Sequence, residues 1–137
     1  MSSGQSSRLI AIVDDDKSVQ TALQDLIESV GLSTVCFGSA EEFLNSGVQD
    51  EAGCLIADIR MPGMSGIELQ AKLKSDRCRI PIIFITAHGD SRMRIQAMRD
   101  GAVEFLTKPF DNAVLLETVY AAIVDHAKIS GLGNTNQ

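Results

Sequence analysis

The stretch CLIADIRMPGMSG, residues 54–66, decides the fold class. Its first four residues are apolar without alternation, which is typical of a strand that other elements cover on both faces. Asp58 follows this run directly. Ser65 and Glu68 fit a capping box, in which each side chain satisfies a free amide of the other, so a helix should begin there. The stretch therefore indicates one βα unit: a buried strand, a loop that begins near a carboxylate, and a helix.

The same unit recurs along the chain without any internal sequence repeat. Four further runs have strand character: residues 9–13, 32–37, 82–85 and 103–106. Amphipathic stretches fill the gaps; Val19, Leu23 and Ile27 recur at helical spacing, and Ser39 with Glu42 fits a second capping box. Because crossovers between parallel strands are right-handed, five βα units predict an α/β fold. We expect a doubly wound, five-stranded parallel sheet with helices on both faces and a ligand site at the carboxyl ends of its strands.

Composition limits the domain count and the classes of partner. A chain of 137 residues, 45% of them hydrophobic, can fold as one domain on one core. A net charge of -6 gives no electrostatic footprint for nucleic acid or anionic lipid, so we expect no direct binding to either. The absence of a membrane or export signal and of zinc-like cysteine spacing predicts a cytoplasmic protein with reduced thiols. We expect a disordered N-terminus over 1–7, a domain over 8–128, and a flexible tail or linker start over 129–137.

Polar residues follow the expected strands at the same end. They are Asp14, Asp15, Asp58, Thr86 and Lys108. In a parallel sheet these positions converge on one edge. Carboxylates held about 4–6 Å apart repel one another by a few kcal/mol per pair, so the cluster needs a cation. Oxygen ligands favour Mg²⁺, with Mn²⁺ possible, over zinc, and such a site can also receive a phosphate group. Thr86 and Lys108 would then offer donors to phosphoryl oxygens.

Four motifs, each at the end of an expected strand, carry a family resemblance. They are IVDDD (12–16), LIADIRMPGMSG (55–66), ITAHGD (85–90) and GAVEFLTKPF (101–110). Together they resemble the receiver domain of two-component response regulators, over a match from about residue 8 to 127. The resemblance implies the flavodoxin-like receiver fold with strand order 2-1-3-4-5. It also implies a cis peptide bond between Lys108 and Pro109.

By this resemblance, Asp58 accepts a phosphoryl group from a phosphohistidine. Asp14, Asp15 and Asp58, together with the backbone carbonyl of Arg60, would hold Mg²⁺. Thr86 and Lys108 would contact the phosphoryl oxygens.

The resemblance also implies a switch. Added phosphoryl charge would draw Thr86 inward, and Phe105 would rotate into the space that this movement frees. The remodelled surface would comprise the fourth helix, fifth strand and fifth helix. The expected partners are a sensor histidine kinase or phosphotransfer protein and, through that surface, a second copy of the chain. The loops at 61–66 and 87–90 are most similar to receivers that control helix-turn-helix effectors, which implies a role in transcription.

Three alternatives remain open from the sequence. Asp14 and Asp16 have the spacing of the nucleophile and general acid of haloacid-dehalogenase-type phosphatases, although that family has no use for Asp58. The favoured interpretation of Asp16 is a helix N-terminal residue. A nucleotide- or flavin-binding module could use the same fold, but no glycine-rich phosphate loop follows the first strand. A receiver could also act as a constitutive interaction module, although the complete acidic set argues against this.

Overall fold

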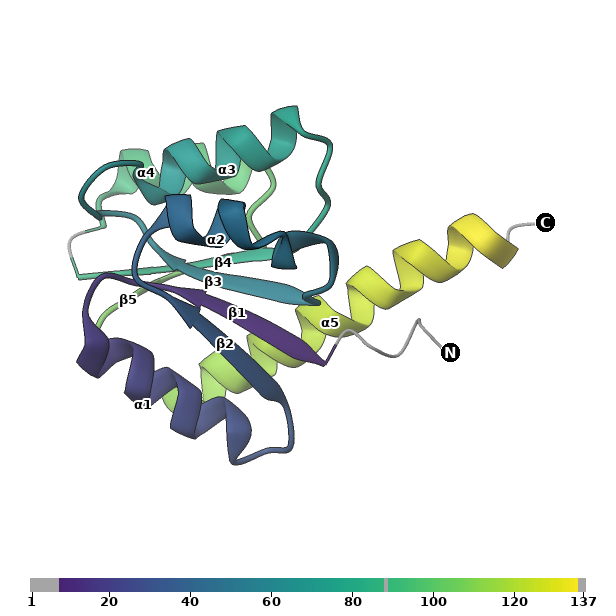
Figure 1. The fold of residues 1–137 in the computed structure, drawn as a ribbon, viewed down its shortest axis with the longest axis horizontal. Helices are drawn as coiled ribbons and strands as arrows, with labels where there is room; N and C mark the ends of the chain where they lie inside the picture. The colour runs from purple at the N-terminus through teal and green to yellow at the C-terminus, as the bar shows by residue number, and fades with distance from the viewer. Residues whose placement is uncertain (1–7, 88, 136–137) are drawn as a thin grey trace.

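In a computed structural model, residues 8–87 and 89–135 are described, with side chains up to Asp125. Strands and helices alternate along the chain (Figure 1). The elements are β1 (Leu9–Val13), α1 (Lys17–Glu28), β2 (Ser33–Phe37), α2 (Ala40–Ser46), the 3-10 turn η2 (Val48–Asp50), β3 (Cys54–Asp58), α3 (Gly66–Ser75), β4 (Ile82–Thr86), α4 (Ser91–Arg99), β5 (Glu104–Thr107) and α5 (Asn112–Thr135). Each of the five expected strands is present; β1 has the expected bounds, and each end of the other four lies within one residue of the expected position.

The five strands form one parallel sheet in the order β2-β1-β3-β4-β5. This confirms the doubly wound architecture and the strand order that the family resemblance implies. The strand order changes direction between β1 and β3, so the carboxyl ends of these two strands are neighbours at one edge of the sheet. That edge is where the topology places a ligand site.

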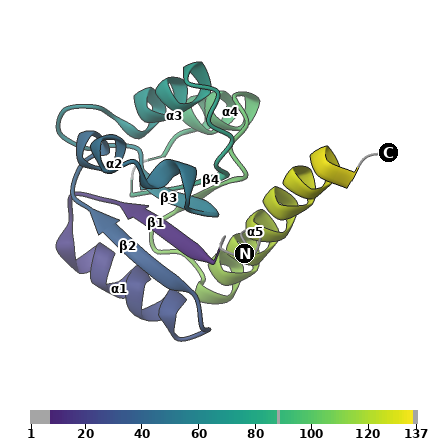
Figure 2. The ribbon, with the colours of Figure 1, turned by 45° about the vertical axis from the view of Figure 1, so that its right-hand side comes forward.

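Helices cover both faces of the sheet, with α2, α3 and α4 on one side and α1 and α5 on the other (Figures 1 and 2). Successive strand residues point to opposite faces. In β1, Ile10 and Ile12 pack with the α1 and α5 layer, whereas Ala11 and Val13 pack with the α2, α3 and α4 layer. Because β3 and β4 are buried along their whole length, they carry the continuous apolar runs seen in the sequence.

The two expected capping boxes have different outcomes. At the start of α3 the box is complete: the Glu68 amide donates to Ser65 Oγ at 3.1 Å, and the Ser65 amide donates to Glu68 Oε1 at 2.9 Å. At the start of α2 only half of it forms. The Glu42 amide donates to Ser39 Oγ, but the Glu42 carboxylate accepts from the amide of Gly38. The second prediction was therefore right about the helix start and wrong about the partner of Glu42.

The last helix reaches into the segment 129–137, for which we expect a flexible tail or the start of a linker. The segment 129–137 has the Gly, Ser and Asn content of a flexible tail, but α5 continues through it to Thr135. A helix that is already nucleated adds each further residue at little cost, so composition alone does not stop it. The last part of this helix extends beyond the sheet (Figure 1). Residues 1–7, expected to be disordered, and 136–137 lie outside the described part of the chain.

Two remaining expectations concern cysteines and membranes. Cys36, Cys54 and Cys78 are free thiols, and complete burial raises the pKa of Cys54 to about 12. Across residues 8–87 and 89–135, none of the helices has both the length and the apolar character that a bilayer crossing requires.

We predict that Ser65→Ala lowers the free energy of unfolding by about 1 kcal/mol, because the α3 amide at Glu68 loses its cap. Chemical denaturation measures this change. Ser75→Ala, at the last turn of the same helix, is the matched control and should change stability by less than about 0.5 kcal/mol. Equal losses in both variants would show that the capping box does not stabilise α3.

Candidate functional site

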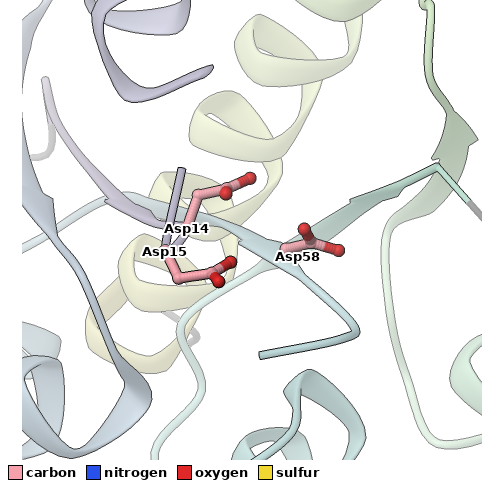
Figure 3. Close-up of side chains that lie close together, drawn as sticks. All are labelled: Asp14, Asp15 and Asp58. Carbon is pink, nitrogen blue, oxygen red and sulfur yellow. The ribbon is translucent and has the colours of Figure 1, made fainter. Parts of the chain in front are cut away.

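Three carboxylates meet at the carboxyl edge of the sheet. Asp14 and Asp15 follow β1, and Asp58 is the last residue of β3. One carboxylate oxygen from each lies within 4.8 Å of the others. Figure 3 shows the side chains of Asp14, Asp15 and Asp58 lying close together, with those of Asp14 and Asp15 extending toward the side on which Asp58 lies. The structure thus brings together the three acidic residues that the sequence placed at strand ends.

Lys108 lies between two of these carboxylates. Its Nζ is 3.2 Å from Asp14 Oδ2 and 3.2 Å from Asp58 Oδ2. The strand β5 ends one residue earlier, and the Lys108 amide donates to the carbonyl of Thr86 at 2.9 Å, which fixes the start of this loop against β4. The Lys108–Pro109 peptide bond is cis, as the resemblance implies.

Burial and neighbouring charges shift the pKa values of Asp14 and Lys108. Burial raises the pKa of Asp14, although the amide of Asp16 and the charge of Lys108 partly oppose the rise. Burial would lower the pKa of Lys108, but the negative charges of Asp14 and Asp58 outweigh it, so that pKa is raised. Lys108 is therefore a permanent cation at neutral pH, and Asp14 is a carboxylate whose charge the protein disfavours. A further cation at this edge would stabilise the negative charge of Asp14.

Gln20 is a site residue that the sequence analysis missed. Its Nε2 donates to the carbonyl of Asp14 at 2.6 Å and to the carbonyl of Phe37 at 3.3 Å, and the residue is only 7% exposed. It thereby ties α1 to the ends of β1 and β2. One signal was available, because Gln20 shares the apolar stripe of α1 with Leu23 and Ile27. A polar residue on such a stripe usually has a buried partner.

Asp16 does not join the acidic cluster. It is the N-cap of α1, and its side chain accepts from the amide of Ser18 at 2.9 Å and from the Ser18 hydroxyl at 2.7 Å. These hydrogen bonds lower the pKa of Asp16. Its carboxylate therefore supports the helix N-terminus, as the favoured interpretation expected. A phosphatase mechanism would require this group as a general acid, a role for which a lowered pKa is unfavourable.

The loop after β3 approaches the site closely. The amide of Arg60 donates to Asp58 Oδ1 at 3.3 Å, so this backbone already contacts the candidate acceptor. The Gly66 amide donates to the carbonyl of Ile59 at 2.8 Å, and a Cβ at Gly66 would clash with the carbonyl of Asp58. The loop is thus folded tightly against the end of β3. The role of the Arg60 carbonyl as a metal ligand remains a prediction.

Thr86 and Phe105 lie on the neighbouring strands. Thr86 ends β4 and is 1% exposed; Phe105 is in β5 and is 3% exposed. The ring of Phe105 packs at a tilt on Phe84, with centroids 6.4 Å apart. The structure therefore shows the ring in the inward position, while its rotation remains a prediction. His88 lies outside the described residues, and the side chain of His126 is also not described.

The arrangement fits a hard divalent cation. All three candidate ligands are carboxylate oxygens, and Asp15 is exposed to solvent. The ammonium group of Lys108 contacts the other two carboxylates. Such cations take one or two carboxylates and retain water or a substrate phosphate in the other positions. Within the described part of the chain, the fold and this edge define an α/β domain with a candidate divalent-cation site at the carboxyl ends of its strands.

Comparison with known proteins identifies the family. The response regulator receiver domain family matches residues 10–120. The chain belongs to this family, whose members are phosphorylation-activated switches of two-component signalling. The alternative assignment to haloacid-dehalogenase-type phosphatases finds no support.

Curated relatives are regulators of about twice this length. Response regulator protein TodT of Pseudomonas putida is 50% identical over 115 residues, which are 84% of this chain and 51% of TodT. Nodulation protein W of Bradyrhizobium diazoefficiens is 48% identical over 114 residues, covering 83% of this chain and 50% of that protein. The chain thus spans about half the length of these relatives.

Solved structures share the fold closely. The response regulator StyR superposes with a TM-score of 0.87 at 43% identity, over 93% of this chain and 65% of StyR. The structure titled FixJ-N has a TM-score of 0.76 at 38% identity, over 84% of this chain and 92% of that chain.

We predict that Mg²⁺ raises the melting temperature of the protein, because a cation at this edge relieves carboxylate repulsion in the folded state only. Stabilisation should reach about 2.7 kcal/mol when the free cation is at 100 times its Kd. Asp15→Asn should remove most of the shift in thermal denaturation. Asp50→Asn removes the same charge in η2, before the amino end of β3, and should retain it. A full shift in Asp15→Asn would contradict the site.

Proposed function

We propose that Asp58 is the phosphoacceptor of this receiver domain. The observation that supports this most is the position of its carboxylate: it ends β3, contacts the Lys108 ammonium at 3.2 Å, and adjoins Asp14 and Asp15. A side chain 11% exposed can still be reached from solvent at the sheet edge. Asp14, in contrast, is 1% exposed, which makes it a poor nucleophile toward an external donor.

The transfer step begins with attack of an Asp58 carboxylate oxygen on the phosphorus of a phosphohistidine. The P–N bond breaks, the imidazole of the donor leaves with its electron pair, and Asp58 becomes an acyl phosphate. Lys108 stabilises charge on the phosphoryl oxygens, and Thr86 offers its hydroxyl to the same group. Attack by water later releases inorganic phosphate. The domain therefore catalyses its own phosphorylation and slow dephosphorylation, and acts as a signalling domain rather than as an enzyme on other substrates.

Asp14, Asp15, Asp58 and the Arg60 carbonyl would hold Mg²⁺, or Mn²⁺ in its place. The cation supplies charge neutralisation between the carboxylates and the incoming phosphoryl group. Gln20 holds the Asp14 backbone in place, and the Arg60 amide orients the Asp58 carboxylate.

The proposed donor is a sensor histidine kinase or a phosphotransfer protein, which places the domain in the cytoplasm. The names of relatives support an output in transcription, since FixJ of Azorhizobium caulinodans, 40% identical over 114 residues, is a transcriptional regulatory protein. In such a protein the receiver would control a separate effector segment. No direct contact of the present domain with nucleic acid is proposed.

The switch surface comprises α4, β5 and α5. Several large apolar side chains are exposed on these elements or directly before β5: Ile95, Met98, Val103, Val114 and Val124. Exposed apolar side chains grouped on neighbouring elements favour association with another protein surface. We propose that phosphorylation brings two copies of the chain together through this surface.

Acetyl phosphate with Mg²⁺ should label wild-type protein on Asp58, and Asp58→Asn should abolish the label, because the amide is not a nucleophile. Asp14→Asn should reduce labelling by about tenfold through weaker metal binding. Mass spectrometry of the intact protein and its peptides measures both effects. A label on Asp14, or full labelling of Asp58→Asn, would overturn the assignment and favour the phosphatase mechanism.

Phosphorylated protein should sediment as a dimer, and Ile95→Glu should weaken that dimer by about tenfold or more, because an unpaired carboxylate would be buried. Analytical ultracentrifugation with and without acetyl phosphate measures this. Thr21→Glu adds the same charge to the exposed face of α1 and should leave dimerisation intact. If both variants dimerise like wild type, the α4–β5–α5 surface is not the interface.

A further inference from the structure

Gly89 lies in the loop between β4 and α4, next to the two proposed switch residues. A Cβ built on Gly89 would lie 2.5 Å from Cε1 and 2.7 Å from Cζ of Phe105, and 2.8 Å from Cγ2 of Thr86. Carbon atoms at van der Waals contact are about 3.5–4.0 Å apart. No side chain larger than hydrogen therefore fits at position 89 while the Phe105 ring and the Thr86 methyl keep their present positions.

Position 89 requires glycine because of the limited space around it, and not because of its backbone conformation. Gly31, Gly47, Gly63 and Gly101 have positive φ angles, which other residues rarely adopt, but Gly89 does not. An alanine could thus take the backbone conformation of Gly89 without strain. The obstacle is only the pair of neighbouring side chains.

The backbone around Phe105 offers little room for compensation. Phe105 pairs with Phe84 in the β4–β5 ladder, and Arg94 Nη1 of α4 donates to the Phe105 carbonyl at 2.9 Å. Arg94 Nη2 also lies 3.6 Å from Glu104 Oε1. With the strand held from two sides, a Cβ at position 89 would displace the ring rather than the backbone of Phe105.

We propose that Gly89 is a positioning residue of the switch: its lack of a side chain creates the space that the inward Phe105 ring occupies beside Thr86. A side chain at position 89 then disfavours the inward ring and uncouples the α4–β5 surface from the phosphorylation site. The uncoupling rests on the proposed function, whereas the competition for space does not.

The first test measures that competition in unphosphorylated protein. Gly89→Ala should lower the melting temperature by about 4–8 °C through overpacking. Phe105→Leu keeps an apolar side chain but removes Cε1 and Cζ, the two ring atoms that the new Cβ would meet. In the Phe105→Leu background, Gly89→Ala should therefore lower the melting temperature by less than in wild type, because only the 2.8 Å approach to Thr86 Cγ2 remains. Gly38→Ala is the control, because its Cβ would be no closer than 3.8 Å to Glu42 Oε1.

The second test follows the switch itself. With acetyl phosphate and Mg²⁺, Gly89→Ala should still be labelled on Asp58 but lose the phosphorylation-dependent change in hydrogen exchange of α4 and β5. The control Gly38→Ala should show both the label on Asp58 and the change in hydrogen exchange. A purely structural role of Gly89 would not separate labelling from the exchange response at temperatures well below unfolding.

The inference is overturned if Gly89→Ala destabilises the Phe105→Leu background as much as wild type, or if it keeps the full exchange response. If Gly89→Ala does not fold, the double variant decides: folding supports the inference and failure overturns it. Absence of label on wild-type Asp58 would instead refute the proposed function, and the melting temperatures would still decide whether Gly89 and Phe105 compete for space.

Discussion

Electrostatic repulsion at one edge of the sheet is the constraint on which the site depends. The topology brings three carboxylates to within 4.8 Å, and two unit charges 4 Å apart repel by about 4 kcal/mol at an effective dielectric of 20. Lys108 opposes three negative charges with one positive charge. Amides and Gln20 hold the carboxylate loops in place. The fold thus keeps a local charge excess that a metal and a phosphoryl donor can use.

The parts of the site differ in how firmly the sheet holds them. β1 and β3 are central strands, each paired on both sides and covered by helices on both faces, so Asp14 and Asp58 are rigidly placed. β5 is an edge strand with one neighbour, and it carries Phe105. Edge elements and the helices on them open more readily than central strands. A change at the acidic cluster can therefore be expressed in the side chains of this edge, such as the ring of Phe105.

Much of this was predictable from local sequence. Apolar runs set the strands, and residues such as Asp58 and Lys108 could be placed together because parallel strands share one edge. The contacts of Gln20 and Arg94 could not be placed, because each joins a helix to strand carbonyls that only the folded sheet positions. The Glu42 carboxylate accepts from the amide of Gly38 rather than from the expected amide of Ser39, one residue later, and this depends on the conformation of the loop. The helical course of 129–135 contradicts its Gly-rich composition, since helix propagation depends on the preceding turns.

The length of α5 has a mechanical consequence. Its 24 residues span about 36 Å, and its last turns stand clear of the sheet (Figures 1 and 2). A helix of this kind fixes orientation as well as distance, because each residue is rotated by about 100° about the helix axis relative to the one before it. Any group fused to its carboxyl end would acquire a defined angular phase relative to the acidic edge. Inserting one residue would change that phase greatly, whereas inserting seven would nearly restore it at a distance about 10 Å greater.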